Sequence, residues 1–298
     1  MLPNFLVIGA GRSGTTSLHH YLGKHPGVYL PRVKSPSYFY CRDLGPSNDP
    51  RVRIVTRNFF VRDAAAYEAL FDGVRDESAI GEVSPAYLAS TAVPARIADR
   101  IPEARLIAIL RNPVDRVYAR YVARLRDGLE ERGDFAAIVR EERAEPLVRD
   151  DASGTYLAAG FCSHVLGSYF ERFNRDRIKI HLFEDLRDDP ARMMAETFAF
   201  LGVDASFPID TKERHNASGG VIRNPLLRKV WTRSALLRAR AQPYVPGWIR
   251  GPVSSAVKRD LDERPLDAEL RAELASLYRA EIEKLQGMLN RDLSHWFA

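Results

Sequence analysis

The feature that most constrains the fold of this chain is a glycine-rich turn near its N-terminus. The run Phe5-Leu-Val-Ile-Gly-Ala-Gly-Arg-Ser-Gly-Thr-Thr-Ser-Leu18 reads as an apolar strand, a tight turn and the start of a helix. Backbone N–H groups in such a turn, together with the positive end of the helix, form a cradle for a phosphate group. A strand that enters a helix in this way predicts an α/β fold.

The turn has the spacing of a Walker A motif from Gly9 to Gly14, but it lacks the lysine of that motif. Thr15 stands at the lysine position, and Arg12 places a cation inside the turn instead. Without a lysine for β- and γ-phosphates, the turn suits a nucleotide that ends in a phosphosulfate better than a triphosphate. A glycine turn that only packs tightly is the alternative. The candidate phosphate-binding residues are Gly11, Arg12, Ser13, Gly14, Thr15 and Thr16.

Length and composition place the chain among globular proteins. Its 298 residues, 45% of them hydrophobic, are enough for one large α/β domain or one domain with a small cap. The net charge of +5 fits the binding of a polyanionic nucleotide and does not by itself indicate nucleic acid. Cys41 and Cys162 are too few for a disulfide framework, which favours a reducing, cytoplasmic location. No apolar stretch approaches about 18 residues, so we expect neither a secretion signal nor a membrane span.

Apolar runs of strand length alternate with helical patterns along the chain. This alternation predicts a three-layer, P-loop-type parallel sheet flanked by helices. Asn112 is expected to cap the longest of the early helices, which has Pro113 at its first position and Gly128 near its end. The expected strands are 5–8, 79–83, 106–110 and 178–182, and the expected helices are 64–71, 92–101 and 113–129.

The whole chain, 1–298, is predicted to form a single domain. Leucines at helical spacings between 266 and 289 predict an amphipathic C-terminal helix within 266–298. The stretch 223–264 is expected to be a basic insertion of helices and loops, and the irregular segment 38–62 is either a loop that lines a site or a surface connection.

Three further segments place charged residues where a ligand would meet a parallel sheet. Arg111 ends the strand in Arg105-Leu-Ile-Ala-Ile-Leu-Arg111, where a planar guanidinium suits a phosphate; its alternative is a structural salt bridge. Glu82, in Ile80-Gly-Glu-Val-Ser-Pro-Ala-Tyr87, is a candidate general base, a metal-binding carboxylate or a partner of Arg12 or Lys34. Lys34 lies shortly after the first expected helix, and its simplest interpretation is an exposed loop lysine.

In this order, the motifs resemble those of PAPS-dependent sulfotransferases, in particular the bacterial sulfotransferase domain related to heparan sulfate and other carbohydrate sulfotransferases. The resemblance implies that Arg111 anchors the 3′-phosphate of PAPS and that Glu82 is the base. It also implies a loop at 215–223 near that phosphate, with Arg214 and Arg223 as candidate contacts. The family spacing places a serine where this chain has Ala119, so one hydroxyl contact is absent.

The catalytic residues implied by the resemblance are Arg12 and Lys34, which would face the leaving group, and Glu82. Sulfuryl transfer builds negative charge on the bridging oxygen, and cations placed there stabilise the transition state. The reaction implied is transfer from PAPS to an acceptor hydroxyl, or to an amine, with release of 3′,5′-ADP and no metal. Carbohydrates, lipids and small natural products are the acceptor classes, and the glutamate motif favours sugar hydroxyls.

Two other functions fit parts of the same sequence. A P-loop kinase that uses Mg-ATP fits the glycine spacing but not Thr15. A non-enzymatic nucleotide- or membrane-binding module fits the stretch 223–259, which has basic and aromatic residues and no acidic ones. This stretch is compatible with an anionic or lipid-linked acceptor, with a membrane surface, or with ordinary helix packing. Arg116, Arg120 and Arg124, four residues apart, are expected to form a solvated helix face.

Overall fold

The computed structural model describes residues 1–41, 60–152, 154–210, 220–222, 224, 230–231, 234, 261–262 and 265–297. The strands of its main sheet are β1 (Phe5–Gly9), β2 (Val28–Tyr29), β3 (Ala79–Val83), β4 (Arg105–Leu110) and β5 (Ile178–Leu182). The α-helices are α1 (Thr15–Leu22), α2 (Tyr38–Cys41), α4 (Ala64–Ala69), α5 (Ala92–Arg100), α6 (Pro113–Asp127), α7 (Phe135–Glu142), α8 (Ser163–Phe170), α9 (Phe183–Asp188), α10 (Pro190–Leu201) and α14 (Ala268–Leu289). Short 3₁₀ turns are η1 (Pro85–Ala89), η2 (Ala158–Gly160), η3 (Arg175–Arg177) and η4 (Ser294–Phe297), and β6 (Val221–Ile222) pairs antiparallel with β7 (Leu261–Asp262).

The main sheet is parallel, with the strand order β2-β3-β1-β4-β5. The four strands predicted from apolar runs are confirmed to within one residue at each end. The two residues of β2 are too few to produce a periodic signal in the sequence. Because β1 lies between β3 and β4, the glycine turn that follows it emerges between the ends of those two strands.

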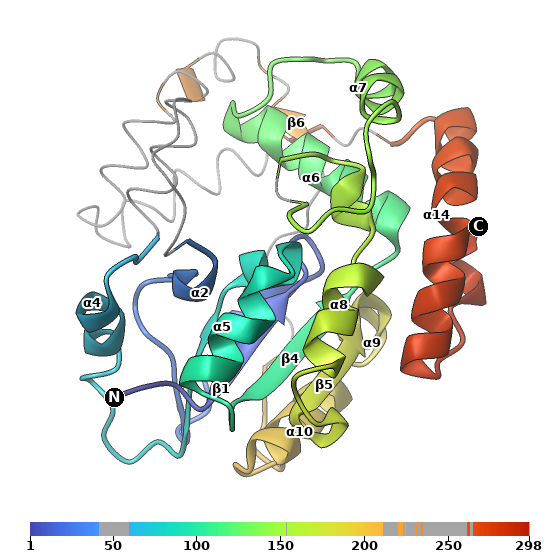
Figure 1. Ribbon diagram of the computed structural model, residues 1–298. Helices are drawn as coiled ribbons and strands as arrows, with labels where there is room; N and C mark the ends of the chain where they lie inside the picture. The colour runs from blue at the N-terminus through green and yellow to red at the C-terminus, as the bar shows by residue number, and fades with distance from the viewer. Residues whose placement is uncertain are drawn as a thin grey trace.

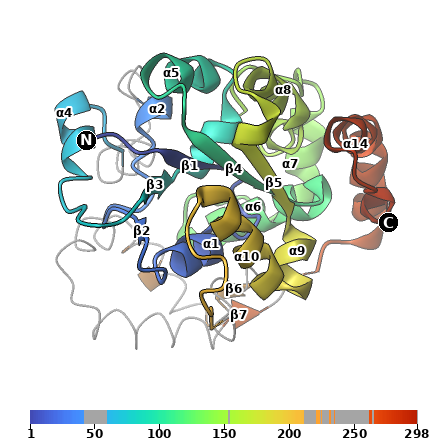
Figure 2. The same cartoon turned by 90° about the horizontal axis from the view of Figure 1, so that it is seen from below.

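Helices cover both faces of the sheet, as Figure 2 shows. Phe5 and Val7 of β1 pack in one core with α1 and α10, whereas Leu6 and Ile8 pack in the other with α5 and α8. Successive residues of a strand point to opposite faces, so an entirely apolar β1 is what a doubly covered strand requires. The predicted three-layer α/β fold is confirmed.

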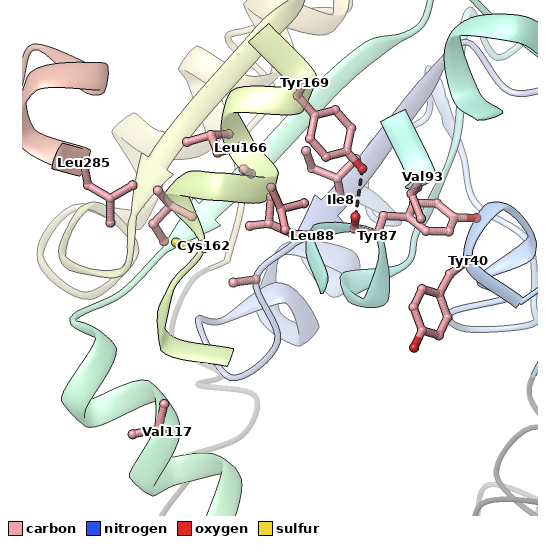
Figure 3. Packing of buried hydrophobic residues seen from close by; sticks show 14 of the residues in the cluster. Ile8, Tyr40, Tyr87, Leu88, Val93, Val117, Cys162, Leu166, Tyr169 and Leu285 are labelled. Atoms are coloured by element: carbon pink, nitrogen blue, oxygen red, sulfur yellow. Dashed lines mark hydrogen bonds between the residues drawn. The ribbon is translucent and has the colours of Figure 1, made fainter. Parts of the chain in front are cut away.

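The segment that follows β3 is fixed inside the larger core. The hydroxyl of Tyr169 on α8 donates to the backbone oxygen of Tyr87 in η1 at 3.0 Å, as Figure 3 shows. Both tyrosine side chains are fully buried. The turn that leaves the carboxyl end of β3 is therefore anchored to a helix on the same face of the sheet.

Helix α6 lies beyond the carboxyl ends of β1 and β4 (Figure 1). Its predicted cap is confirmed, because Oδ1 of Asn112 accepts the N–H of Val114 at 2.9 Å. Gly128 ends the helix in the left-handed region, with φ of 75°. The prediction of a solvated arginine face is wrong at Arg116, which is only 9% exposed. The reason is that α14 packs beside α6 and brings the buried carboxylate of Glu281 close to this arginine.

The predicted C-terminal helix is present as α14. Glu281 holds it against the start of α8, accepting the N–H of Ser163 at 2.7 Å and its hydroxyl at 2.6 Å. Most of 223–264 lies outside the described residues, so the basic insertion expected there stays a prediction. None of the helices in the described part of the chain is long and apolar enough to cross a membrane.

Candidate donor-binding and catalytic site

The turn between β1 and α1 has a conformation that suits a phosphate group. Arg12 and Gly14 both have positive φ angles, 69° and 95°. The positive φ of Gly14 favours glycine, and a Cβ atom there would lie 2.3 Å from Cδ2 of Leu186, so the leucine side chain would have to move. The hydroxyl of Ser13 is fully buried and has no hydrogen-bond partner among the described residues. A buried donor without a partner at a helix N-terminus fits a bound phosphate oxygen.

Lys34 lies beside this turn. Its Nζ donates to Oγ1 of Thr16, on the first turn of α1, at 2.9 Å. Burial lowers the pKa of Lys34, and the charge of Arg12 lowers it further. Burial and then Lys34 lower the pKa of His19 to about 4, so this imidazole is neutral at pH 7. The positive charge of Arg12 therefore acts on Lys34, while the carboxylate of Asp127 acts on Arg12. Positive charge gathered beside a glycine turn suits an anion.

Arg111 joins the same turn from the end of β4. Its Nη1 donates to the backbone oxygen of Arg12 at 3.2 Å, and its guanidinium lies 4.5 Å from the centre of the Phe183 ring. Burial lowers the pKa of Arg111, and its Nε has no partner in the described part of the chain. The predicted phosphate anchor is thus oriented by a backbone oxygen and an aromatic ring, and part of its hydrogen-bonding capacity remains open.

Glu82, near the end of β3, is 1% exposed and accepts hydrogen bonds from three hydroxyl groups. Its Oε1 accepts from Tyr67 at 2.8 Å and from Tyr87 at 2.6 Å, and its Oε2 accepts from Ser84 at 2.5 Å. Burial raises the pKa of Glu82, and the three hydrogen bonds oppose that rise because they favour the charged form. Its partners are hydroxyls rather than the Arg12 or Lys34 side chains.

Two backbone amides of the segment after Lys34 donate to these same hydroxyls. The N–H of Ser37 donates to Oγ of Ser84 at 2.9 Å, and the N–H of Phe39 donates to the hydroxyl of Tyr87 at 3.3 Å. Each of these two hydroxyls in turn donates a hydrogen bond to the carboxylate of Glu82. The segment that carries the lysine is thereby tied to the carboxylate through two chains of hydrogen bonds.

The structure brings the predicted residues from the glycine turn together with Lys34 and Arg111, and it places Glu82 on the neighbouring strand. Arg214 and Arg223 lie outside the described residues. Ala119 is buried on α6. Within the described ranges, no group of three or more His, Cys, Asp or Glu side chains could hold a metal ion.

Several residues that the structure adds to the site are not among those predicted from the sequence. Ser84 and Tyr87 lie inside the glutamate motif, two and five residues after the carboxylate, so the motif itself contained a signal for them. Tyr67 comes from α4, and Phe183 follows β5. No spacing in the sequence links those two aromatic residues to the motifs.

Comparisons with known proteins agree with this geometry. A family model described as "Sulfotransferase family" matches residues 3–207. The chain is 29% identical over 206 residues to bifunctional heparan sulfate N-deacetylase/N-sulfotransferase 2 of Mus musculus, a match that covers 68% of this chain and 22% of that protein. It is 25% identical over 304 residues to the N-deacetylase/N-sulfotransferase 4 of the same organism, covering 99% of this chain and 31% of that protein. The chain therefore spans less than a third of the length of these relatives.

Among solved structures, a sulfotransferase from Alicyclobacillus acidocaldarius matches over the whole length of both chains. The match has a TM-score of 0.76 and 28% sequence identity. The sheet and its flanking helices therefore have the arrangement of a known enzyme of this class.

Proposed function

Because the chain belongs to the sulfotransferase family, we propose that it uses PAPS as donor and transfers the sulfuryl group to an acceptor on a carbohydrate. The observation that carries this proposal is the pairing of a glycine turn that lacks the P-loop lysine with two adjacent cations, Arg12 and Lys34. A triphosphate enzyme needs the missing lysine, whereas a donor whose leaving group is a nucleotide 5′-phosphate needs positive charge at the turn itself.

The residues present fit such a donor. PAPS would supply the sulfuryl group and leave as 3′,5′-ADP. The N–H groups of the turn and the open hydroxyl of Ser13 would bind the 5′-phosphate. Arg111, with its unpartnered Nε, would bind the 3′-phosphate. Lys34 and Arg12 would stabilise the charge that develops when the bond between sulfur and the phosphate oxygen breaks.

Glu82 is the proposed base. As the bond between sulfur and the acceptor atom forms, the acceptor must lose a proton, and this carboxylate would take it. Its buried position and raised pKa make the carboxylate a better proton acceptor than an exposed one. The three hydroxyl donors leave about one lone-pair position of the carboxylate, on Oε2, and the proton of the acceptor would go there.

Calorimetric titration with 3′,5′-ADP, 5′-ADP and ATP, each with and without Mg²⁺, tests the donor. We expect 3′,5′-ADP to bind at least about tenfold more tightly than 5′-ADP, since a charge-assisted hydrogen bond to the extra phosphate contributes about 1.5–3 kcal/mol. The binding should not require Mg²⁺. Preference for Mg-ATP would overturn the proposed donor in favour of a kinase. Binding of none of the three nucleotides would also overturn the proposed donor.

The acceptor proposed is a sugar hydroxyl, and a sugar amine is the second candidate because the curated relatives are named as N-sulfotransferases. An oligosaccharide with free glucosamine amines should be compared with its N-acetylated counterpart, using labelled PAPS. Equal labelling of both supports a hydroxyl acceptor, and labelling of the free amine alone supports N-sulfation. Labelling of neither, with a donor that binds, would exclude this carbohydrate class.

A further inference from the structure

Asp115, on the first turn of α6, is shared by two arginines from distant parts of the chain. Its Oδ1 lies 2.6 Å from Nη2 of Arg271 on α14. Its Oδ2 lies 4.0 Å from Nη2 of Arg111, at the end of β4. One carboxylate therefore places a guanidinium of the C-terminal helix beside the proposed 3′-phosphate anchor.

The contact to Arg111 is the weaker of the two. The distance of 4.0 Å between Nη2 of Arg111 and Oδ2 of Asp115 is too long for a hydrogen bond. A second carboxylate nearby, that of Glu184, instead accepts the indole N–H of Trp296 at 3.0 Å. Arg111 thus keeps its Nε without a partner among the described residues, although its side chain is only 17% exposed. An anion that reached this position would find an open donor and a second cation next to it.

The same face of α6 lacks the hydroxyl that the sulfotransferase pattern supplies. Ala119 follows Asp115 by four residues, so the two side chains are neighbours on the helix surface. Ala119 offers no donor to a phosphate. Arg271 reaches the Asp115 side of this face from α14, which lies beside α6.

We propose that Arg271 is a second guanidinium for the 3′-phosphate of the donor, in place of the missing serine hydroxyl, and that Asp115 holds Arg271 in position until the nucleotide binds. This inference rests on the proposed PAPS-type donor. A phosphomonoester carries more negative charge than a carboxylate and accepts bidentate hydrogen bonds from guanidinium groups. It can therefore compete with Asp115 for both arginines.

The test compares Arg271→Gln with Arg143→Gln in calorimetric titrations with 3′,5′-ADP and 5′-ADP. Arg143 is a matched control because it also ties another segment to α14, through Glu273 at 2.7 Å, and is equally exposed at 37%. We expect Arg271→Gln to weaken 3′,5′-ADP binding about tenfold or more and to leave 5′-ADP binding unchanged. Arg143→Gln should leave the ratio of the two affinities at its wild-type value.

Asp115→Asn separates a ligand contact from a structural one. If Arg271 binds the phosphate, removal of the competing carboxylate should tighten 3′,5′-ADP binding, in the opposite direction to Arg271→Gln. If the ion pair serves only to hold α14 on α6, both variants should weaken binding alike or leave the ratio unchanged, and either result overturns the inference. A wild-type protein that does not prefer 3′,5′-ADP over 5′-ADP would overturn the proposed donor together with the inference.

Discussion

Replacing Glu82 by glutamine is expected to slow sulfuryl transfer by about 10²–10⁴-fold, the usual contribution of a general base. Glutamine has nearly the same size and can still accept hydrogen bonds, but it cannot take the proton of the acceptor. The affinity for 3′,5′-ADP should stay near its wild-type value, because this side chain contacts hydroxyl groups rather than the glycine turn. Transfer rates and nucleotide titrations on the same preparation measure both quantities.

Glu281→Gln is the matched control for this experiment. Glu281 is also a buried carboxylate, 5% exposed, whose pKa burial raises and whose oxygens accept hydrogen bonds from Ser163. It lies where α14 meets α8, so its replacement should lower the melting temperature without a specific loss of rate. A Glu82→Gln protein that retained the wild-type rate at unchanged nucleotide affinity would rule out the base assignment.

The pH dependence of transfer gives the same prediction a second readout. A base acts only when ionised, so the rate should rise with pH through the pKa of Glu82. Since burial raises that pKa, the acid limb should lie above the ordinary glutamate value of about 4.3. Tyr67→Phe removes one donor that stabilises the carboxylate, and it should move the acid limb to higher pH. An acid limb that moved to lower pH would contradict a role for this hydroxyl at the base.

The fold is largely readable from the sequence because its strands are short, apolar and separated by helical patterns. Strands β3 and β5 match their predicted limits, and the cap of α6 follows from Asn112 and Pro113. The prediction of a solvated arginine face was wrong at Arg116, which is buried. Residues four apart share one face of a helix, but this spacing does not show whether that face meets water or another helix. Only the position of α14, far along the chain, decides between these possibilities.

The contacts of the candidate site also differ in how far the sequence predicts them. Contacts within one motif, such as the Ser84 hydroxyl on the carboxylate two residues before it, could be anticipated from local spacing. Contacts between elements could not. Tyr67 reaches that carboxylate from α4, and Arg271 lies 156 residues beyond Asp115. The packing of separate helices creates these pairs, and a single sequence has no periodicity that reports them.

Replacing Lys34 by methionine is expected to lower the turnover number by about 10²–10³-fold, the effect of removing one preorganised group that stabilises developing charge. Methionine keeps much of the length and the apolar stem but removes the ammonium group that contacts Thr16 beside Arg12. The charge on the leaving phosphate oxygen increases in the transition state, so the turnover number should fall more than the affinity for 3′,5′-ADP. Single-turnover rates and nucleotide titrations separate the two effects.

Lys24→Met is the control, because Lys24 is exposed and its Nζ donates only to the backbone oxygen of Asp210, at 3.4 Å, among the described residues. It removes the same charge from the surface and should leave the turnover number unchanged. If Lys34→Met weakened nucleotide binding as much as it slowed transfer, Lys34 would bind the nucleotide equally in the ground and transition states. The stabilisation of the leaving group would then fall to Arg12, which belongs to the turn and retains its charge in this variant.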